Sequence, residues 1–248
     1  MSWGQITITY LSNTKAARQT AAEIKEFGCE CIAVKTNMPI EPDFVDSVID
    51  QTMRAFSTHG IDILVASAPR LTLPQKATTT HVSTQVNNAG IAPLHTMGTF
   101  NPAVFDEMFH TNVLCPLLYI QSVLPSIRRG GSIINLTSIG ARTVLGGDTA
   151  LYTASKAALE HLTRNLAITH SAPRGITINN VCPGATDTDA LRALPEQLVD
   201  IVKNEWTAER RLGTPEEIAD CVCFLAGGGG ARWINGATIA ACGGAAMF

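Results

Sequence analysis

The sequence predicts an α/β domain built on a doubly wound parallel sheet. Short runs rich in β-branched residues alternate with helical stretches along the whole chain. This alternation is typical of parallel strands with helices on both faces. The 248 residues are 46% hydrophobic, which is enough to bury one sizeable core. The sequence shows no linker and no internal repeat, so we expect a single domain over residues 1–248.

Local signals place the expected elements. Asn13 is a plausible N-cap and Gly28 a C-terminal stop for the first helix. The expected strands are Ile6–Tyr10, Cys31–Lys35, Ile61–Val65, a run ending at Ser138, 176–181 and 234–240. The expected helices are 13–27, 42–57, 101–127, one that carries Tyr152, and 214–226.

Composition narrows the possible functions. A net charge of -3 without a basic stripe argues against a nucleic-acid partner. No apolar run is long enough to span a bilayer and no signal peptide is visible, so we expect no membrane partner and a cytoplasmic location. The seven cysteines form no CxxC pair and are interpreted as reduced thiols. No His/Cys spacing suits a closed metal site, and we expect no metal.

Tyr152 and Lys156 are the most informative residues. Four positions apart on a helix, they share one face. An ammonium beside a phenol stabilises the phenolate and lowers its pKa from about 10, which makes Tyr152 a usable general acid/base. Ser138 closes the uncharged run Gly130–Ser138 and presents a hydroxyl at the carboxyl end of a strand. The alternative is a solvated helical pair and an ordinary strand-end cap.

The order of these residues extends to two further motifs. Asn87–Gly90 precedes them and Pro183-Gly184 follows them. Together they resemble the short-chain dehydrogenase/reductase family, over nearly the whole chain from Ile6 onward. The chain looks most similar to the fungal carbonyl reductases that act on polyketide-type aromatic ketones, through Tyr10–Asn13 and the Gly243-Gly244 ending. The resemblance implies a Rossmann-like fold.

The resemblance also implies roles for four catalytic residues: Asn112, Ser138, Tyr152 and Lys156. Tyr152 exchanges a proton with the substrate oxygen, and Lys156 lowers the pKa of Tyr152 and binds the nicotinamide ribose. Ser138 orients and polarises the carbonyl. Asn112 holds a water in the proton relay, although it could equally be a polar residue inside a helix.

A cofactor site is implied in the same way. The matching positions are Asn37, Asn88, Gly90, Tyr152, Lys156, Pro183, Gly184, Thr186 and Thr188. Asn37 matches a position that faces adenine, and the segment from Pro183 covers the nicotinamide. Asn88 and Gly90 could instead be simple turn formers, and the residues from Pro183 to Thr188 the start of a loop.

One departure from the family concerns the phosphates of the cofactor. The family begins with a strand and a TGxxxGxG turn whose backbone cradles the pyrophosphate at a helix N-terminus. Here Gly4 is the only glycine before Gly28, and the first strand, Ile6–Tyr10, matches the second strand of the family. The first strand-turn-helix unit is missing from this sequence. We therefore expect a sheet without its central strand and weak cofactor binding.

A second departure is an insertion. The family runs directly from a strand like Ile61–Val65 into Asn-Asn-Ala-Gly, whereas here residues 66–86 intervene. They are rich in Thr and Ser and show no period, so we expect an irregular loop. One interpretation is a substrate lid. Another is that residues 65–85 are a translated, in-frame intron of 21 codons.

These observations support three hypotheses. The first is an NADP(H)-dependent ketone reductase or alcohol dehydrogenase; NADP is preferred because no acidic residue follows Tyr10, although NAD stays possible. The second is a cofactor-independent dehydratase, isomerase or cyclase that uses Ser138 and Tyr152. The third is a non-catalytic partner of intact subunits.

The resemblance further implies a homo-oligomer and a small-molecule substrate. In the family, the region matching Asp189–Arg210 varies with the substrate. Apolar residues there indicate an apolar substrate, although they could also pack on the core. They are Leu191, Leu194, Leu198 and Trp206.

Overall fold

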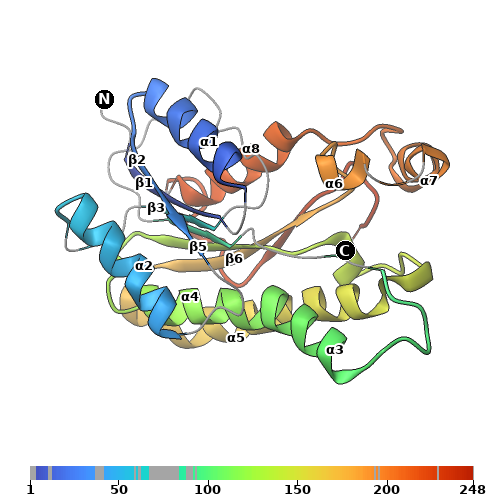
Figure 1. Ribbon diagram of the computed structural model, residues 1–248, viewed down its shortest axis with the longest axis horizontal. Coiled ribbons are helices and arrows are strands. Elements are labelled where there is room, and N and C mark those ends of the chain that lie inside the picture. Colours follow the sequence, from blue (N-terminus) through green and yellow to red (C-terminus); the bar gives the residue numbers. More distant parts are fainter. Residues whose placement is uncertain are drawn as a thin grey trace.

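The protein forms a seven-stranded parallel sheet in the order β2-β1-β3-β4-β5-β6-β7 (Figure 1). The computed structural model describes residues 4–10, 13–36, 42–58, 60, 63–66, 84–87, 92, 94–192, 194, 196–227 and 229–247. Its strands are β1 (Gln5–Tyr10), β2 (Glu30–Lys35), β3 (Ile63–Ala66), β4 (Thr84–Asn87), β5 (Ser132–Leu136), β6 (Thr177–Pro183) and β7 (Thr238–Ala241).

Eight α-helices lie within the described residues. They are α1 (Thr14–Glu26), α2 (Pro42–Ala55), α3 (Pro102–Phe109), α4 (Cys115–Val123), α5 (Ala150–Arg174), α6 (Asp189–Arg192), α7 (Glu196–Ile201) and α8 (Pro215–Ala226). Two π-helices are inserted, η1 (His110–Leu114) and η4 (Val202–Trp206), and two short 3-10 turns, η2 (Ile139–Ala141) and η3 (Gly147–Thr149), precede α5.

The sheet is the middle layer of three. Figure 1 shows α1 and α8 on one face and α2, α4 and α5 on the other. On the first face, Ala17 and Ile24 of α1 pack on Ile6 and Ile8. On the second, α2 and α4 share a buried cluster that includes Val45. The predicted doubly wound fold is confirmed, and it leaves the carboxyl ends of the strands along one edge for ligands.

Helix ends follow the expected sequence signals. The Asn13 side chain accepts a hydrogen bond from the Ala16 amide, 2.9 Å away, at the start of α1. α8 begins with a capping box, in which the side chains of Thr214 and Glu217 each accept a hydrogen bond from the backbone amide of the other residue. α5 ends at Gly175, whose φ of 63° is the left-handed conformation that glycine adopts readily. The glycine cap therefore marks where α5, the long helix beside the site, stops.

The expectation of a sheet without its central strand is wrong. β3 lies between β1 and β4, with Ile6 opposite Ile63 and Ile63 opposite Thr84. The position that the missing amino-terminal strand would take is filled by a later segment of the same chain. Backbone pairing explains how this is possible, because a parallel ladder satisfies N–H and C=O groups whatever side chains the strand carries.

The expectation of an irregular loop over residues 66–86 is also wrong at both ends of that segment. Ala66 ends β3, and Thr84–Asn87 is β4, which pairs with β3 on one side and with β5 on the other. Thr and Val are favoured in strands, and here they are paired on both sides. Residues 67–83 lie outside the described residues. The lid and the translated intron therefore both stay hypotheses.

Candidate active site

The candidate site lies beyond the carboxyl ends of β5 and β6. Ser138 follows β5 by two residues, and its backbone is extended, with φ -164°. Its Oγ caps η2 by accepting a hydrogen bond from the Gly140 amide, 3.2 Å away. A Cβ on Gly140 would lie 2.8 Å from Leu145 Cδ1 and from Thr153 Cγ2, so a larger residue there would force these side chains to shift where the turn meets α5.

Tyr152 stands opposite, in the first turn of α5. The Ser138 hydroxyl is close enough to Tyr152 for a hydrogen-bonding interaction that lowers the pKa of the tyrosine. Ser138 is buried and Tyr152 is half-buried. The structure thus brings together the two hydroxyl groups that the sequence predicted to act on one substrate oxygen, from segments 14 residues apart.

The predicted electrostatics of Tyr152 is wrong in sign. Burial raises the pKa of Tyr152, and the hydrogen bond with Ser138 only opposes that shift. The Nζ atom of Lys156 lies 6.0 Å from the centre of the Tyr152 ring and donates a hydrogen bond to the Leu136 carbonyl, 3.0 Å away. The ammonium is therefore held by the end of β5, and burial outweighs its influence on the phenol.

Lys156 is itself a costly group to bury. Its side chain is 5% exposed, and burial lowers its pKa to about 8. An ammonium has three donors, and the bond to Leu136 uses one of them. The other two can serve hydroxyl groups of a bound ligand. A buried cation with donors to spare fits a ribose, as the resemblance implied.

Asn112 lies in η1, the π-helix between α3 and α4. It is fully buried, and its Nδ2 donates to Ser155 Oγ at 2.9 Å and to Met108 Sδ at 3.2 Å. Ser155 Oγ in turn donates to the Tyr152 carbonyl at 2.7 Å. π-Bulges occur frequently at functional sites. Asn112 is thus connected through Ser155 to the turn of α5 that carries Tyr152, and its water-holding role stays a prediction.

The segment after β6 forms the opposite wall. Pro183 ends β6, and the Gly184 amide donates to the Ala241 carbonyl at 2.9 Å. A Cβ on Gly184 would lie 2.7 Å from the Cα of Cys242, so glycine is required there. Thr186 Oγ1 donates to the Gly184 carbonyl at 3.0 Å, and Thr188 stands just before α6. These four predicted positions lie on the loop that leaves the sheet edge.

Three predicted cofactor residues have no structural account. Asn37, Asn88 and Gly90 lie outside the described residues. β4 ends at Asn87, so the chain enters the Asn-Asn-Ala-Gly motif from a strand beside β5, as the resemblance implied.

The residues fit one end of a dinucleotide and not the other. Lys156 and the loop from Pro183 suit a nicotinamide ribose. The central strand of a doubly wound sheet normally leads into the phosphate-binding glycines. Here the central strand is β3, and the sequence after it is Ser67-Ala68-Pro69-Arg70, without glycine. Without glycines at these positions, a pyrophosphate cannot approach the backbone N–H groups as closely as it does in the usual phosphate-binding turn.

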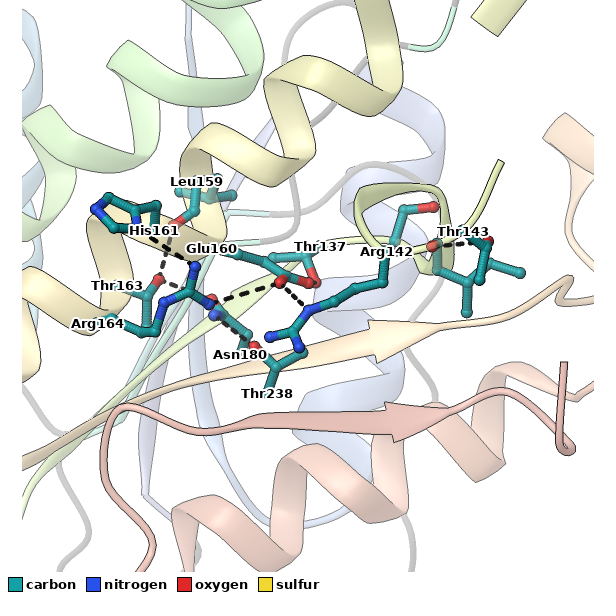
Figure 2. A network of polar contacts seen from close by, with 12 residues as sticks. Thr137, Arg142, Thr143, Leu159, Glu160, His161, Thr163, Arg164, Asn180 and Thr238 are labelled. Atoms are coloured by element: carbon teal, nitrogen blue, oxygen red, sulfur yellow. Dashed lines mark hydrogen bonds and ion pairs between the residues drawn. The ribbon is translucent and has the colours of Figure 1, made fainter. Parts of the chain in front are cut away.

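A buried ion pair behind the site was missed by the sequence reasoning (Figure 2). The Glu160 carboxylate is 2% exposed and lies 2.6 Å from Arg142 Nε. Glu160 lies eight residues after Tyr152 on α5. The sequence signal for it was this spacing, because residues at i, i+4 and i+8 lie on one helix face.

Two further expectations concern metals and membranes. Across the described part of the chain, no group of three or more His, Cys, Asp or Glu side chains is arranged to hold a metal ion. Within the same ranges, every helix is too short or too polar to cross a bilayer.

The fold is a doubly wound α/β sheet, and Ser138, Tyr152 and Lys156 lie together beyond the carboxyl ends of its strands. A family model described as enoyl-(acyl carrier protein) reductase matches residues 17–246. The short chain dehydrogenase asqE of Emericella nidulans is 32% identical over 246 residues, covering 97% of this chain and 83% of that protein. The chain belongs to the short-chain dehydrogenase/reductase family, a family of enzymes.

Two further relatives show how far the likeness extends. The tetrahydroxynaphthalene reductase of Pyricularia oryzae is 26% identical over 255 residues, covering 98% of this chain and 81% of that protein. A crystal structure of a short chain dehydrogenase from Burkholderia cenocepacia in complex with NADP shares 30% identity and a TM-score of 0.81, covering 97% of this chain and 87% of that one.

Proposed function

We propose that this chain is an NADP(H)-dependent oxidoreductase that interconverts a ketone and a secondary alcohol. The observation that carries the proposal is that the Ser138 and Tyr152 hydroxyls interact with each other while the buried Lys156 lies 6.0 Å from the Tyr152 ring centre. Two neutral hydroxyl donors at one point suit a carbonyl oxygen that gains negative charge during reduction. Membership of an oxidoreductase family supports the same reaction class.

In this mechanism each residue has a local task. The bound cofactor supplies or accepts the hydride at the substrate carbon. Ser138 donates a hydrogen bond to the substrate oxygen and fixes its direction. The Tyr152 hydroxyl transfers its proton to that oxygen during reduction, and takes it back during oxidation. Lys156 holds ribose hydroxyls with the two donors that Leu136 does not use.

The cofactor preference rests on the end of β1. An NAD enzyme usually places an acidic residue there to bind the ribose hydroxyls. The first turn of α1, which follows β1, contains no acidic residue. The Burkholderia cenocepacia relative was solved with NADP. NADP is therefore the proposed cofactor, with NAD as the second choice.

The proposed substrate is an apolar or aromatic secondary metabolite. Leu191, Leu194 and Trp206, on the segment that follows the Pro-Gly loop, are half-buried, so part of their apolar surface stays open to a ligand. Leu198 was predicted to join them, and its side chain lies outside the description. The name of the Pyricularia oryzae relative denotes reduction of a polyhydroxylated naphthalene. A flat aromatic ketone fits this wall better than a charged substrate.

We also propose a cytoplasmic homo-oligomer. Phe105, Leu114 and Ile168 are exposed on α3, η1 and α5, with Ile168 82% exposed. Such apolar side chains on neighbouring helices favour burial against a second copy. Size-exclusion chromatography with light scattering will show an assembly larger than 26.4 kDa if this is correct.

The missing glycines favour a second candidate. Without a pyrophosphate cradle, Ser138 and Tyr152 could catalyse a dehydration, isomerisation or cyclisation that needs only proton transfer. A non-catalytic partner subunit is the third possibility. Titration with NADPH by calorimetry, together with turnover assays on aromatic ketones and alcohols, separates the three. NADPH binding with NADPH-dependent turnover supports the first, turnover without cofactor supports the second, and association with an intact homologue without turnover supports the third.

A further inference from the structure

Glu160 is a buried carboxylate that the proposed reaction does not use. Its side chain is 2% exposed, and burying a carboxylate is costly unless it is paired and hydrogen-bonded. Glu160 meets that condition (Figure 2): Oε1 accepts from Thr137 Oγ1 at 3.1 Å, and Oε2 accepts from Arg142 Nε at 2.6 Å. Arg164 Nη1 lies farther away, 3.9 Å from Oε2.

The two close partners flank Ser138 in the sequence. Thr137 is the residue before Ser138, and Arg142 is the C-cap of the η2 turn that Ser138 begins. One carboxylate therefore holds the chain on both sides of the hydroxyl. Arg164 is different, because it lies on α5 itself, four residues after Glu160. Its ion pair with Glu160 therefore involves no residue of the Ser138 segment.

Helix α5 contacts that segment at three successive turns. Lys156 donates to the Leu136 carbonyl, Glu160 binds Thr137 and Arg142, and Tyr152 is close enough to Ser138 for the serine to lower its pKa. Residues at i, i+4 and i+8 lie along one helix face. Because Tyr152 and Glu160 share a rigid helix, whatever fixes the segment to Glu160 also fixes Ser138 relative to Tyr152.

We propose that Glu160 is a positioning residue that acts through Thr137 and Arg142 to hold the Ser138 hydroxyl against Tyr152. This proposal rests on the proposed function, in which those two hydroxyls bind the substrate oxygen. Glu160 itself does not reach the substrate. Its carboxylate matters because it holds Arg142, whose side chain is 31% exposed, through a close ion pair of 2.6 Å.

Glu160→Gln tests the proposal with little change of shape. The amide can still accept from Thr137 but loses the charge-assisted bond to Arg142. We expect kcat to fall about tenfold with the KM for NADPH unchanged, since the defect concerns orientation at the reacting oxygen. Arg142→Gln should reproduce the effect. Arg164→Gln is the matched control, because it removes a cation near the same carboxylate without touching the Ser138 segment, and it should leave kcat unchanged.

A double-mutant cycle with Ser138→Ala distinguishes positioning from general destabilisation. Once Ser138 has no hydroxyl to place, Glu160→Gln should lower kcat by less than about twofold further. If Glu160→Gln costs the same tenfold in both backgrounds, or if Arg164→Gln behaves like Glu160→Gln, the proposal is overturned.

A readout without turnover separates this proposal from the proposed function. The Ser138 hydrogen bond lowers the pKa of Tyr152, so its loss should raise that pKa. The chain has three tyrosines, and their titration is followed by the ultraviolet absorbance of the phenolate. Subtracting the titration curve of Tyr152→Phe isolates the contribution of Tyr152. If the pKa of Tyr152 is higher in Glu160→Gln than in the wild type and unchanged in Arg164→Gln, the positioning role is supported even if NADPH is never turned over. Identical titrations in Glu160→Gln and the wild type would sink it.

Discussion

The two halves of the sheet differ in how closely they follow the pattern of the family. In the carboxyl-terminal half, β5, α5 and β6 bring Ser138, Tyr152 and Lys156 to one place, in the order and spacing that the family has. In the amino-terminal half, β3 takes the central position and no glycine-rich turn follows it. The residues proposed for proton transfer are therefore together, whereas the sequence after the central strand lacks the glycines that normally bind a pyrophosphate.

This difference shows that completing a sheet and binding a cofactor make unequal demands on sequence. A strand position needs only backbone groups that pair and side chains that suit a buried face, so Ile63–Ala66 can fill it. A phosphate cradle needs backbone amides that converge on an anion, which depends on glycine at fixed positions. A chain can therefore keep its fold by recruiting another segment and still lose affinity for the cofactor.

Deleting residues 65–85 should have the largest effect on the amino-terminal half of the sheet. The deletion joins Leu64 to Val86 and merges β3 and β4 into one strand, so the sheet loses one of its seven members. β1 or β5 then loses its pairing partner, and buried backbone groups are left without hydrogen bonds. We expect loss of cooperative unfolding, measured by circular dichroism in urea. A folded deletion variant would show that β3 is dispensable.

Tyr152→Phe should have the largest effect on a folded chain. It removes the proton that the carboxyl-terminal half supplies, and general acid/base catalysis is typically worth about 10²–10⁴-fold. We expect kcat to fall about 1000-fold while substrate binding is largely kept. Tyr119→Phe is the control, because Tyr119 is a buried residue of α4 and belongs neither to the Ser138 segment nor to α5. Near-normal turnover in Tyr152→Phe would exclude both enzymatic proposals.

Lys156→Met should abolish turnover and raise the free energy of unfolding. The pKa of Lys156 is about 8 in the folded protein, below the usual 10.5, so the unfolded chain binds its proton more readily. The group is charged in both states below pH 8 and neutral in both above 10.5. Its destabilising effect is therefore full at pH 7 and fades as the pH rises through that window.

The measurement compares Lys156→Met with the wild type in urea at several pH values. The variant should be more stable by about 3 kcal/mol at pH 7, and the difference should shrink toward pH 10. Comparing the two chains cancels other groups such as Cys182, whose pKa is raised to about 12 by burial. A difference that does not change with pH would mean that Lys156 is not strained by burial. Turnover should be lost at every pH.

Local signals could be predicted from the sequence, and long-range competition could not. Asn13 was identified as a cap because the bond it accepts comes from three residues away. The site residues were found because a spacing of four on a helix determines a shared face. The pKa of Tyr152 was predicted with the wrong sign, because burial depends on what packs around the ring. Strand order and the Glu160 pair with Arg142 also depend on which distant segments meet.

Restoring the missing cradle should sharpen the comparison. The chain as written should bind NADPH weakly, because its contacts reach the nicotinamide end and leave the phosphates without convergent backbone donors. A family-type strand with a TGxxxGxG turn, placed before Ile6, could supply them. Because β3 already occupies the central position, such a graft alone has no place in the sheet. The graft should succeed only when residues 65–85 are deleted as well.

Calorimetry on three proteins decides this last prediction: the unmodified chain, the graft alone, and the graft combined with the deletion. The graft combined with the deletion should bind NADPH about 100-fold more tightly than the unmodified chain, and the graft alone should bind no better than it. Sequencing the mature transcript is the complementary test, because loss of codons 65–85 from the message would show that the natural protein carries the deletion half of this design. If the unmodified chain binds NADPH at micromolar affinity, about 8 kcal/mol, some other segment holds the phosphates. In that case the amino-terminal half has replaced the function of the missing unit as well as its strand.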